Sequence, residues 1–220
     1  MKFPDSTYFN RKLPKQRFYE NLTVSAATKK SFVDQIKSIY WENKISADTI
    51  NIAAENTVTE IEIFRINLNQ DTIDESVLRL LDKGIPYPMI FILQYNRKSK
   101  LCAAYKEISS TGECHIVSQY YHTEWDLESN IELEILGLSI ESVYHGFIRQ
   151  IAGDRISENS SNIKYDIEIS KQKDKLVIEI ERAEKMAWKE KQPKKKFELA
   201  DRVKKLKRQL ESLEHQKIDG

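Results

Sequence analysis

The chain has 220 residues, 40% of them hydrophobic and 31% charged, with a formal net charge of +1. This length accommodates one domain of ordinary size plus an appendage, and ten tyrosines, eight phenylalanines and three tryptophans exclude a disordered chain. No apolar run approaches the roughly 18 residues that cross a bilayer, and the first residues lack the apolar stretch of a signal peptide. We therefore expect a cytoplasmic protein that does not enter a membrane.

Residues 1–22 are polar and basic, and we expect them to form an extended N-terminal arm. Arg11 and Lys12 belong to a basic patch in this arm, which could dock on a partner or enter a nucleic-acid groove. A mobile terminus is the simpler interpretation of the same composition.

Residues 23–156 are expected to form one core domain. Apolar residues at helical spacing predict its helices, and alternating or continuous apolar runs predict its strands. In chain order these patterns predict a helix at 28–43, strands at 49–52 and 57–68, a helix at 73–83, strands at 89–93, 100–108, 114–121 and 131–136, and a helix at 139–152. The fold class that follows is α+β, with a mostly antiparallel sheet of five or six strands and helices packed on it.

Local signals refine two of the predicted helices. Ile36 and Ile39 continue the apolar stripe of the first helix. Thr72, with Glu75 three residues later, predicts a capping box for the second helix, and Gly84 is suited to ending that helix in the left-handed conformation.

The two cysteines of the chain, Cys102 and Cys114, lie on two strands of a predicted meander. If Ile108 faces Glu113 across a four-residue turn, Cys102 lies opposite Gln119. The two sulfurs are then too far apart for a disulfide, which tolerates a Cα separation of roughly 7 Å. We expect two free thiols.

A linker rich in small and polar residues is predicted at 153–162, before a helical arm at 163–220. Apolar residues recur in this arm at alternating spacings of four and three, which is typical of coiled-coil-like seams. The seam residues are Leu176, Ile180, Ala183 and Ala187, then Leu199, Val203, Leu206, Leu210 and Leu213. Pro193 either kinks one long helix or divides it into a hairpin. Two heptads per seam are too few for an isolated coiled coil, so the arm should pack on itself, on a second copy or on another protein.

The small net charge hides a basic segment within the helical arm. Nine basic and two acidic residues lie between Lys191 and Arg208, a net charge of +7, which leaves −6 on the rest of the chain. The candidate nucleic-acid contacts in this segment are Lys191, Lys194, Lys195, Lys196, Arg202, Lys204, Lys205 and Arg208. Phosphate contact is the functional interpretation, because bound lysines and arginines release condensed counterions. The solvated face of a coiled coil explains the same charges.

Two weaker patterns concern metal ions and cofactors. His122, Glu124 and Asp126 stand at alternate positions, which would share one face of an extended strand, as a metal site requires. Ordinary charges at the end of a surface strand explain this pattern equally well. The chain has no glycine-rich phosphate loop and no dinucleotide-binding fingerprint. We therefore predict no metal and no cofactor.

Motifs distributed over nearly the whole chain resemble those of one bacterial family. They are the segments 13–22, 32–36, 49–52, 60–64, 85–88, 105–106, 124–125, 143–144 and 147–152, with Trp41 and the Lys/Glu-rich helical tail. The family is one of the numbered families of unknown function. The resemblance implies an accessory component encoded beside helicases and DNA methyltransferases in restriction-like defence loci, with a partner from one of these classes. It brings no catalytic residue.

A divergent metal-dependent nuclease is one alternative function. That chemistry needs an acidic residue at a strand end and a Glu-x-Lys motif on the next strand, to hold magnesium and activate water. Glu60 and Glu62 supply carboxylates and Lys106 lies on a plausible neighbouring strand, but no lysine follows Glu62 by two residues.

The sequence shows no recognisable catalytic site. Our first hypothesis is a non-catalytic accessory subunit of a restriction-modification-like phage-defence or DNA-processing assembly. In it the core binds a partner protein, and the basic arm contacts nucleic acid or mediates assembly. The nuclease is the second hypothesis, and the third is a structural dimerisation module in which the seams pair two copies.

Overall fold

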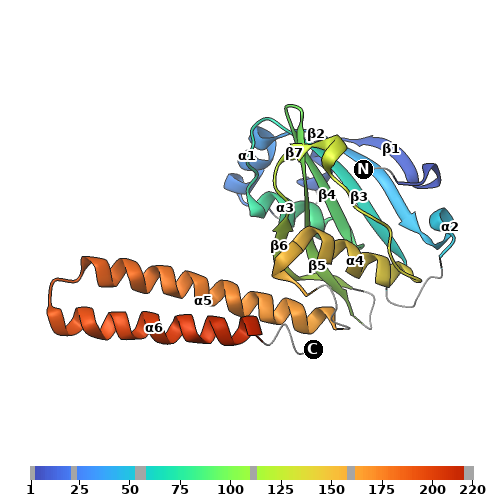
Figure 1. The fold of residues 1–220 in the computed structure, drawn as a ribbon. Coiled ribbons are helices and arrows are strands. Elements are labelled where there is room, and N and C mark those ends of the chain that lie inside the picture. Colours follow the sequence, from blue (N-terminus) through green and yellow to red (C-terminus); the bar gives the residue numbers. More distant parts are fainter. Residues whose placement is uncertain (1–2, 21–23, 53–57, 110–112, 158–161, 216–220) are drawn as a thin grey trace. The chain divides into compact units, whose positions relative to one another are not determined.

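The structure is a computed structural model that describes residues 3–20, 24–52, 58–109, 113–157 and 162–215. The chain forms two compact units, residues 1–153 and residues 154–220 (Figure 1). The first unit is a sheet with helices on it, and the second contains two long helices.

A mixed seven-stranded sheet is the framework of the first unit. Its strands are β1 (Tyr8–Leu13), β2 (Ile36–Ser46), β3 (Glu60–Leu68), β4 (Met89–Tyr95), β5 (Lys98–Ile108), β6 (Cys114–His122) and β7 (Asp126–Leu127). The order is β1-β2-β3-β4-β5-β6, with β7 beside β5. Of the described strand pairs only β3 and β4 run parallel. A parallel pair needs a crossover, and helix α3 (Glu75–Lys83) lies within it. The α+β class is confirmed, while the sheet is larger than predicted and contains this parallel pair.

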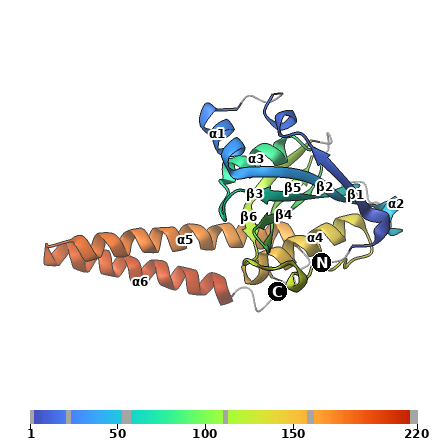
Figure 2. The same ribbon diagram turned by 90° about the horizontal axis from the view of Figure 1, so that it is seen from above.

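Helices cover both faces of the sheet (Figure 2). Helices α1 (Ala26–Gln35) and α3 lie on one face, and α4 (Ile140–Ala152) lies on the other. The short helical segments are η1 (Asp5–Thr7), η2 (Lys15–Phe18), α2 (Ala47–Ile50), η3 (Glu128–Asn130) and η4 (Gly153–Arg155). Because both faces are covered, the first five residues of β4 are all buried, as its continuous apolar run predicts.

The predicted helix at 28–43 is wrong in its second half. Helix α1 ends at Gln35, and strand β2 begins at the next residue. A register shift between Ile36 and Ser38 places one extra residue in β2, so Ile36 and Ile39 are both fully buried. A bulged strand therefore reproduced the three-residue spacing that predicts a helix.

Three other segments also differ from their predictions. Residues 8–13 form β1 and pair with β2, where a free arm was expected. Residues 47–50 form helix α2, so the strand predicted at 49–52 is absent. The segment 131–136 forms no strand in the structure, and the short β7 precedes it.

The predicted ends of helix α3 are corrected as well. Its N-cap residue is Asp74, whose backbone N–H donates to the Gln35 side chain (2.8 Å), so the Thr72–Glu75 capping box does not form. Gly84 at the other end is right-handed, with φ −76°. Helix α4 follows its prediction closely, with a capping box between Ser139 and Ser142.

Both cysteines are free, as predicted. Their register differs from the prediction, because Ile108 pairs with Cys114 and a shift between Ala104 and Lys106 places Cys102 opposite His122.

The second unit is a helical hairpin of α5 (Ile163–Lys189) and α6 (Pro193–His215). Pro193 is the first residue of α6, a position where its missing N–H and fixed φ are favourable. Ile180, Ala183 and Leu206 form the buried centre of the seam between the helices, and Leu176, Val203 and Leu210 pack against them. The hairpin alternative is therefore the one observed. No described helix is long and apolar enough to cross a membrane.

Candidate functional site

The basic candidates of the helical arm lie on the exposed surface of the hairpin. Lys191, Lys194, Lys195, Lys196, Arg202, Lys204, Lys205 and Arg208 are all exposed. Arg202 lies 4.0 Å from Glu179 of α5, and Lys205 pairs with Asp201 of its own helix at 2.9 Å. The other six form no ion pair within the described part of the chain. Their charges are therefore available to an external anion.

The turn of the hairpin combines these charges with exposed aromatic rings. We define the tip surface as Trp188, Lys189, Lys191, Lys194, Lys195, Lys196 and Phe197. Trp188 is 83% exposed and Phe197 is 77% exposed. Glu190 is the acidic residue of this turn, and the N–H of Gln192 donates to its carboxylate at 2.8 Å. That backbone N–H lowers the pKa of Glu190, and the charge of Lys195 contributes.

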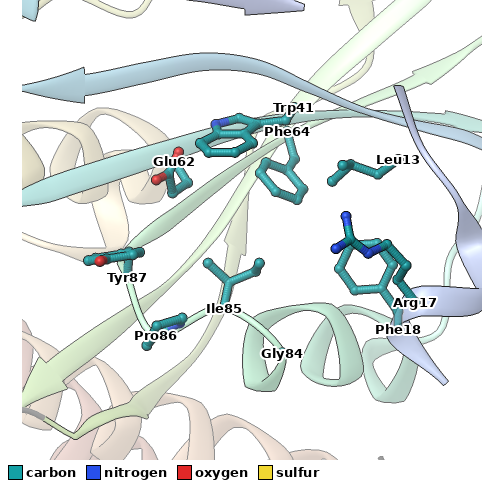
Figure 3. A pocket seen from close by; sticks show the side chains of 10 residues that line it. All are labelled: Leu13, Arg17, Phe18, Trp41, Glu62, Phe64, Gly84, Ile85, Pro86 and Tyr87. Atoms are coloured by element: carbon teal, nitrogen blue, oxygen red, sulfur yellow. The ribbon is translucent and has the colours of Figure 1, made fainter. Parts of the chain in front are cut away.

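A separate pocket of about 380 Å³ opens in the α+β unit (Figure 3). We call it the Glu62 pocket. It is lined by Leu13, Arg17, Phe18, Trp41, Glu62, Phe64, Gly84, Ile85, Pro86 and Tyr87. These residues come from four parts of the chain: the end of β1 with η2, strand β2, strand β3 and the loop between α3 and β4. Figure 3 shows Glu62 between Trp41 and Tyr87 at one end of the pocket and Arg17 at the other.

Glu62 is a buried acid in an apolar wall, because only 3% of its surface is exposed. Burial raises the pKa of its carboxyl group to about 7, and the neighbouring charge of Glu60 adds to the rise. The indole N–H of Trp41 lies near enough to oppose this rise, yet neither Nε1 of Trp41 nor Oε2 of Glu62 completes a hydrogen bond within the structure. These two buried polar atoms lie next to each other at one end of the pocket.

The loop after α3, which forms one wall of the pocket, is held together with the end of that helix by a buried lysine. Nζ of Lys106 donates to the carbonyl oxygens of Asp82 (2.8 Å), Ile85 (3.0 Å) and Tyr87 (2.8 Å). An ammonium group has three N–H donors, so these bonds use all of them. The Asp82 carboxylate, 2.9 Å away, then interacts with Lys106 mainly through charge.

Two further contacts fix the ends of this loop. The hydroxyl of Tyr120 donates to Oδ2 of Asp82. The backbone N–H of Glu62 donates to the carbonyl of Pro88 at 2.9 Å. The wall of the pocket is thus formed in advance of any ligand.

The three residues of the nuclease alternative make different contacts and do not form one site. Glu60 pairs with Lys44 at 2.8 Å, Glu62 faces the pocket, and Lys106 supports the loop. His122, Glu124 and Asp126 are exposed at the end of β6 and just beyond it. Over the described ranges, no group of three or more His, Cys, Asp or Glu side chains is placed to hold a metal ion.

Arg11 and Lys12 of the second basic patch are exposed on strand β1. Their backbones pair with Trp41 and Tyr40 of β2, so they belong to the edge of the sheet. The Glu62 pocket was not predicted as a site from the sequence. Glu62 stands between Ile61 and Ile63, but the polar residues Glu60 and Arg65 lie close by, so this stretch gives no local signal of a pocket.

These features define a mixed-sheet α+β protein with a pocket in the first unit and a C-terminal helical hairpin. The model of a family, the domain of unknown function DUF4391, matches residues 1–210. The chain therefore belongs to this family, as the resemblance in its motifs implies. No curated protein matches the chain. No solved structure matches it either.

Proposed function

We propose that this protein is a non-catalytic accessory subunit of a restriction-modification-like defence or DNA-processing assembly in the cytoplasm. In it the helical hairpin contacts the nucleic-acid backbone and the α+β unit binds a partner protein. The observation that carries the proposal is the tip surface, where exposed lysines without described ion pairs lie close in sequence to two exposed aromatic residues. The partner class, a helicase or a methyltransferase, follows from the family resemblance alone.

The position of three consecutive lysines supports contact with phosphate. Lys194, Lys195 and Lys196 directly follow Pro193, the first residue of α6. The N-terminus of a helix carries partial positive charge, so cations there are locally unfavourable. An anion at the same place is attracted both by the helix terminus and by the ammonium groups. A bound phosphate would therefore relieve a repulsion that is present in the free protein.

The seam of the hairpin favours this function over the dimerisation module. Ile180, Ala183 and Leu206 are covered within one chain. Pairing of two copies would therefore need another surface, while the exposed basic residues remain available.

The test is fluorescence anisotropy of labelled duplex DNA at low salt, with the full chain. The triple substitution Lys194→Glu, Lys195→Glu and Lys196→Glu should weaken binding by roughly tenfold or more, because it replaces three attractive phosphate contacts by repulsive ones. A matched control, Lys30→Glu, Lys83→Glu and Arg97→Glu, changes net charge equally at exposed positions of the α+β unit.

The control should lose much less affinity than the tip variant. Equal losses in both variants would show that only net charge matters, and the tip surface would then have no special role. Absence of binding by the unsubstituted chain at low salt would also reject the proposal.

A further inference from the structure

The two aromatic residues of the tip surface take no part in the packing of the hairpin. Trp188 is 83% exposed and Phe197 is 77% exposed. Neither belongs to the apolar cluster that holds α5 against α6. They lie within two turns of the loop that joins these helices, one on each side of it (Figure 1). The faces of both rings are therefore available to a flat partner.

The outer face of α5 extends the basic surface away from the tip. Arg182, Lys185 and Lys189 each follow a seam position by two residues, which is about 200° around a helix, so they lie opposite the contact with α6. All three are exposed, and within the described part of the chain they form no ion pair. An open hollow of about 320 Å³ lies on this face, and it is lined by Ile178, Glu181, Arg182, Lys185, Met186 and Lys189.

Single-stranded nucleic acid offers what both features require. Its phosphates match a row of cations, and its unpaired bases present flat faces that stack on aromatic side chains. A duplex offers the same phosphates, but its base faces already stack on one another. It would leave Trp188 and Phe197 without a partner unless its base pairs unstack, which costs free energy.

An anionic membrane surface also attracts lysines and aromatic rings, but the hairpin lacks the apolar face that such a surface requires. A helix that lies in a membrane interface has a broad apolar side opposite its charged side. On the outer face of α5, Ile178 and Met186 stand among charged residues. Phe197 directly follows three lysines of α6. The mixture of cations and separate rings favours nucleic acid over lipid.

We propose that the hairpin binds single-stranded nucleic acid in preference to a duplex. The bases stack on Trp188 and Phe197, and the phosphates contact the lysines of the tip surface and the cations of the outer face of α5. This inference rests on the proposed function, because it names the form of nucleic acid that the hairpin takes. A DNA strand and an RNA strand offer the same phosphates and base faces, so either is a source of this ligand.

The experiment is fluorescence anisotropy of the full chain with labelled oligothymidylate and with a duplex of equal length. The strand should bind more tightly than the duplex. The double variant Trp188→Ala and Phe197→Ala should weaken strand binding by roughly tenfold or more, because stacking on both rings is lost. Its duplex affinity should stay within about twofold, because the phosphate contacts remain. Oligouridylate in parallel assigns the preferred strand to RNA or to DNA.

Three controls show whether stacking is the cause. Tyr165→Ala removes an exposed ring at the other end of α5 and should leave strand affinity within about twofold. Trp188→Leu with Phe197→Leu keeps apolar side chains without rings and should lose as much affinity as the alanine variant, while Trp188→Tyr with Phe197→Tyr should retain most of it. An abasic strand, which keeps its phosphates, should bind the unsubstituted chain and the alanine variant equally.

Equal affinity for strand and duplex would overturn this inference, and so would strand binding that persists without both rings. Binding of phosphatidylserine vesicles that requires the rings, without ring-dependent strand binding, would overturn it by assigning the tip to a membrane surface. If the triple tip variant loses duplex binding while the alanine variant still binds the strand normally, this inference fails and the proposed function stands. If the unsubstituted chain binds neither strand nor duplex, both fail.

Discussion

Glu62 is an ionisable residue of β3 that lines a mostly apolar pocket. Its side chain is buried, which disfavours the charged form of its carboxyl group. The pKa of this carboxyl rises from 4.5 to about 7 on folding. Between these two pH values the folded chain binds more protons than the unfolded chain, so this group makes stability fall as pH rises. A shift of this size corresponds to about 3 kcal/mol.

The substitution Glu62→Gln should therefore change the pH dependence of stability. It should leave the free energy of unfolding nearly unchanged at pH 4 and raise it by up to about 3 kcal/mol at pH 8. Urea unfolding across this pH range measures the difference. Glu132→Gln is the comparison, because it changes an exposed carboxyl group away from Glu62 and should leave stability nearly unchanged. A parallel pH profile for Glu62→Gln and the unsubstituted chain would contradict this account.

Lys106 acts on the pocket through the loop that it holds. Its side chain and that of Asp82 are each 1% exposed. Burial raises the pKa of Asp82, while the charge of Lys106 opposes that rise. Lys106→Met should therefore lower the free energy of unfolding by about 3–5 kcal/mol, since it leaves a buried carboxylate unpaired.

The double variant Lys106→Met and Asp82→Leu tests whether the unpaired Asp82 carboxylate causes this loss of stability. Removal of both charges should recover part of the lost stability in denaturant unfolding, because the uncompensated charge is gone while the three carbonyl oxygens still lack their donor. If the double variant is as unstable as the sum of the two single variants, the ion pair is not the origin of the effect.

At the scale of elements, the hairpin depends on one narrow apolar seam. Leu206 is 8% exposed and packs against α5 together with Val203 and Leu210. Leu206→Ala should destabilise the hairpin by about 2–4 kcal/mol through the cavity that it leaves. Hydrogen exchange should show faster exchange of α5 and α6 amides, while the exposed Ser212→Ala has little effect. Unchanged protection of the α6 amides would refute the seam as the stabilising contact.

Elements with strong local signals were predictable from sequence. The buried strand β4 has a continuous apolar run from Met89 to Leu93, and helix α4 has an apolar stripe with Ser139 as its cap. Strand β2 was not predictable, because its bulge after Ile36 imitates helical spacing. Pairing with the distant strand β3 determines the structure of this segment, and no local sequence pattern indicates that pairing.

The two candidate sites differ in how far apart in the sequence their residues lie, and this decides which of them could be predicted. The basic segment of α6 is contiguous, so composition alone located it. The Glu62 pocket brings together residues from four parts of the chain, and Arg17 and Glu62 are 45 positions apart. Only the pairing of β1 with β2 and of β2 with β3 places them around one cavity.

Across the whole molecule, charge is divided unequally along the sequence. The segment from Lys191 to Arg208 carries +7, and the remainder of the chain carries −6. If the hairpin contacts nucleic acid as proposed, this division favours association through the segment from Lys191 to Arg208 and disfavours it elsewhere. The net charge of +1 gives no indication of this behaviour.

The measurement that tests the central claim most directly is the salt dependence of duplex DNA binding by the full chain and the triple tip variant. Each phosphate contact contributes about 0.9 to the slope of the logarithm of affinity against the logarithm of salt concentration. If Lys194, Lys195 and Lys196 contact phosphate, the variant should have a slope shallower by roughly three. Identical slopes, or no salt-sensitive binding by the unsubstituted chain, would contradict the claim that the tip surface contacts nucleic acid.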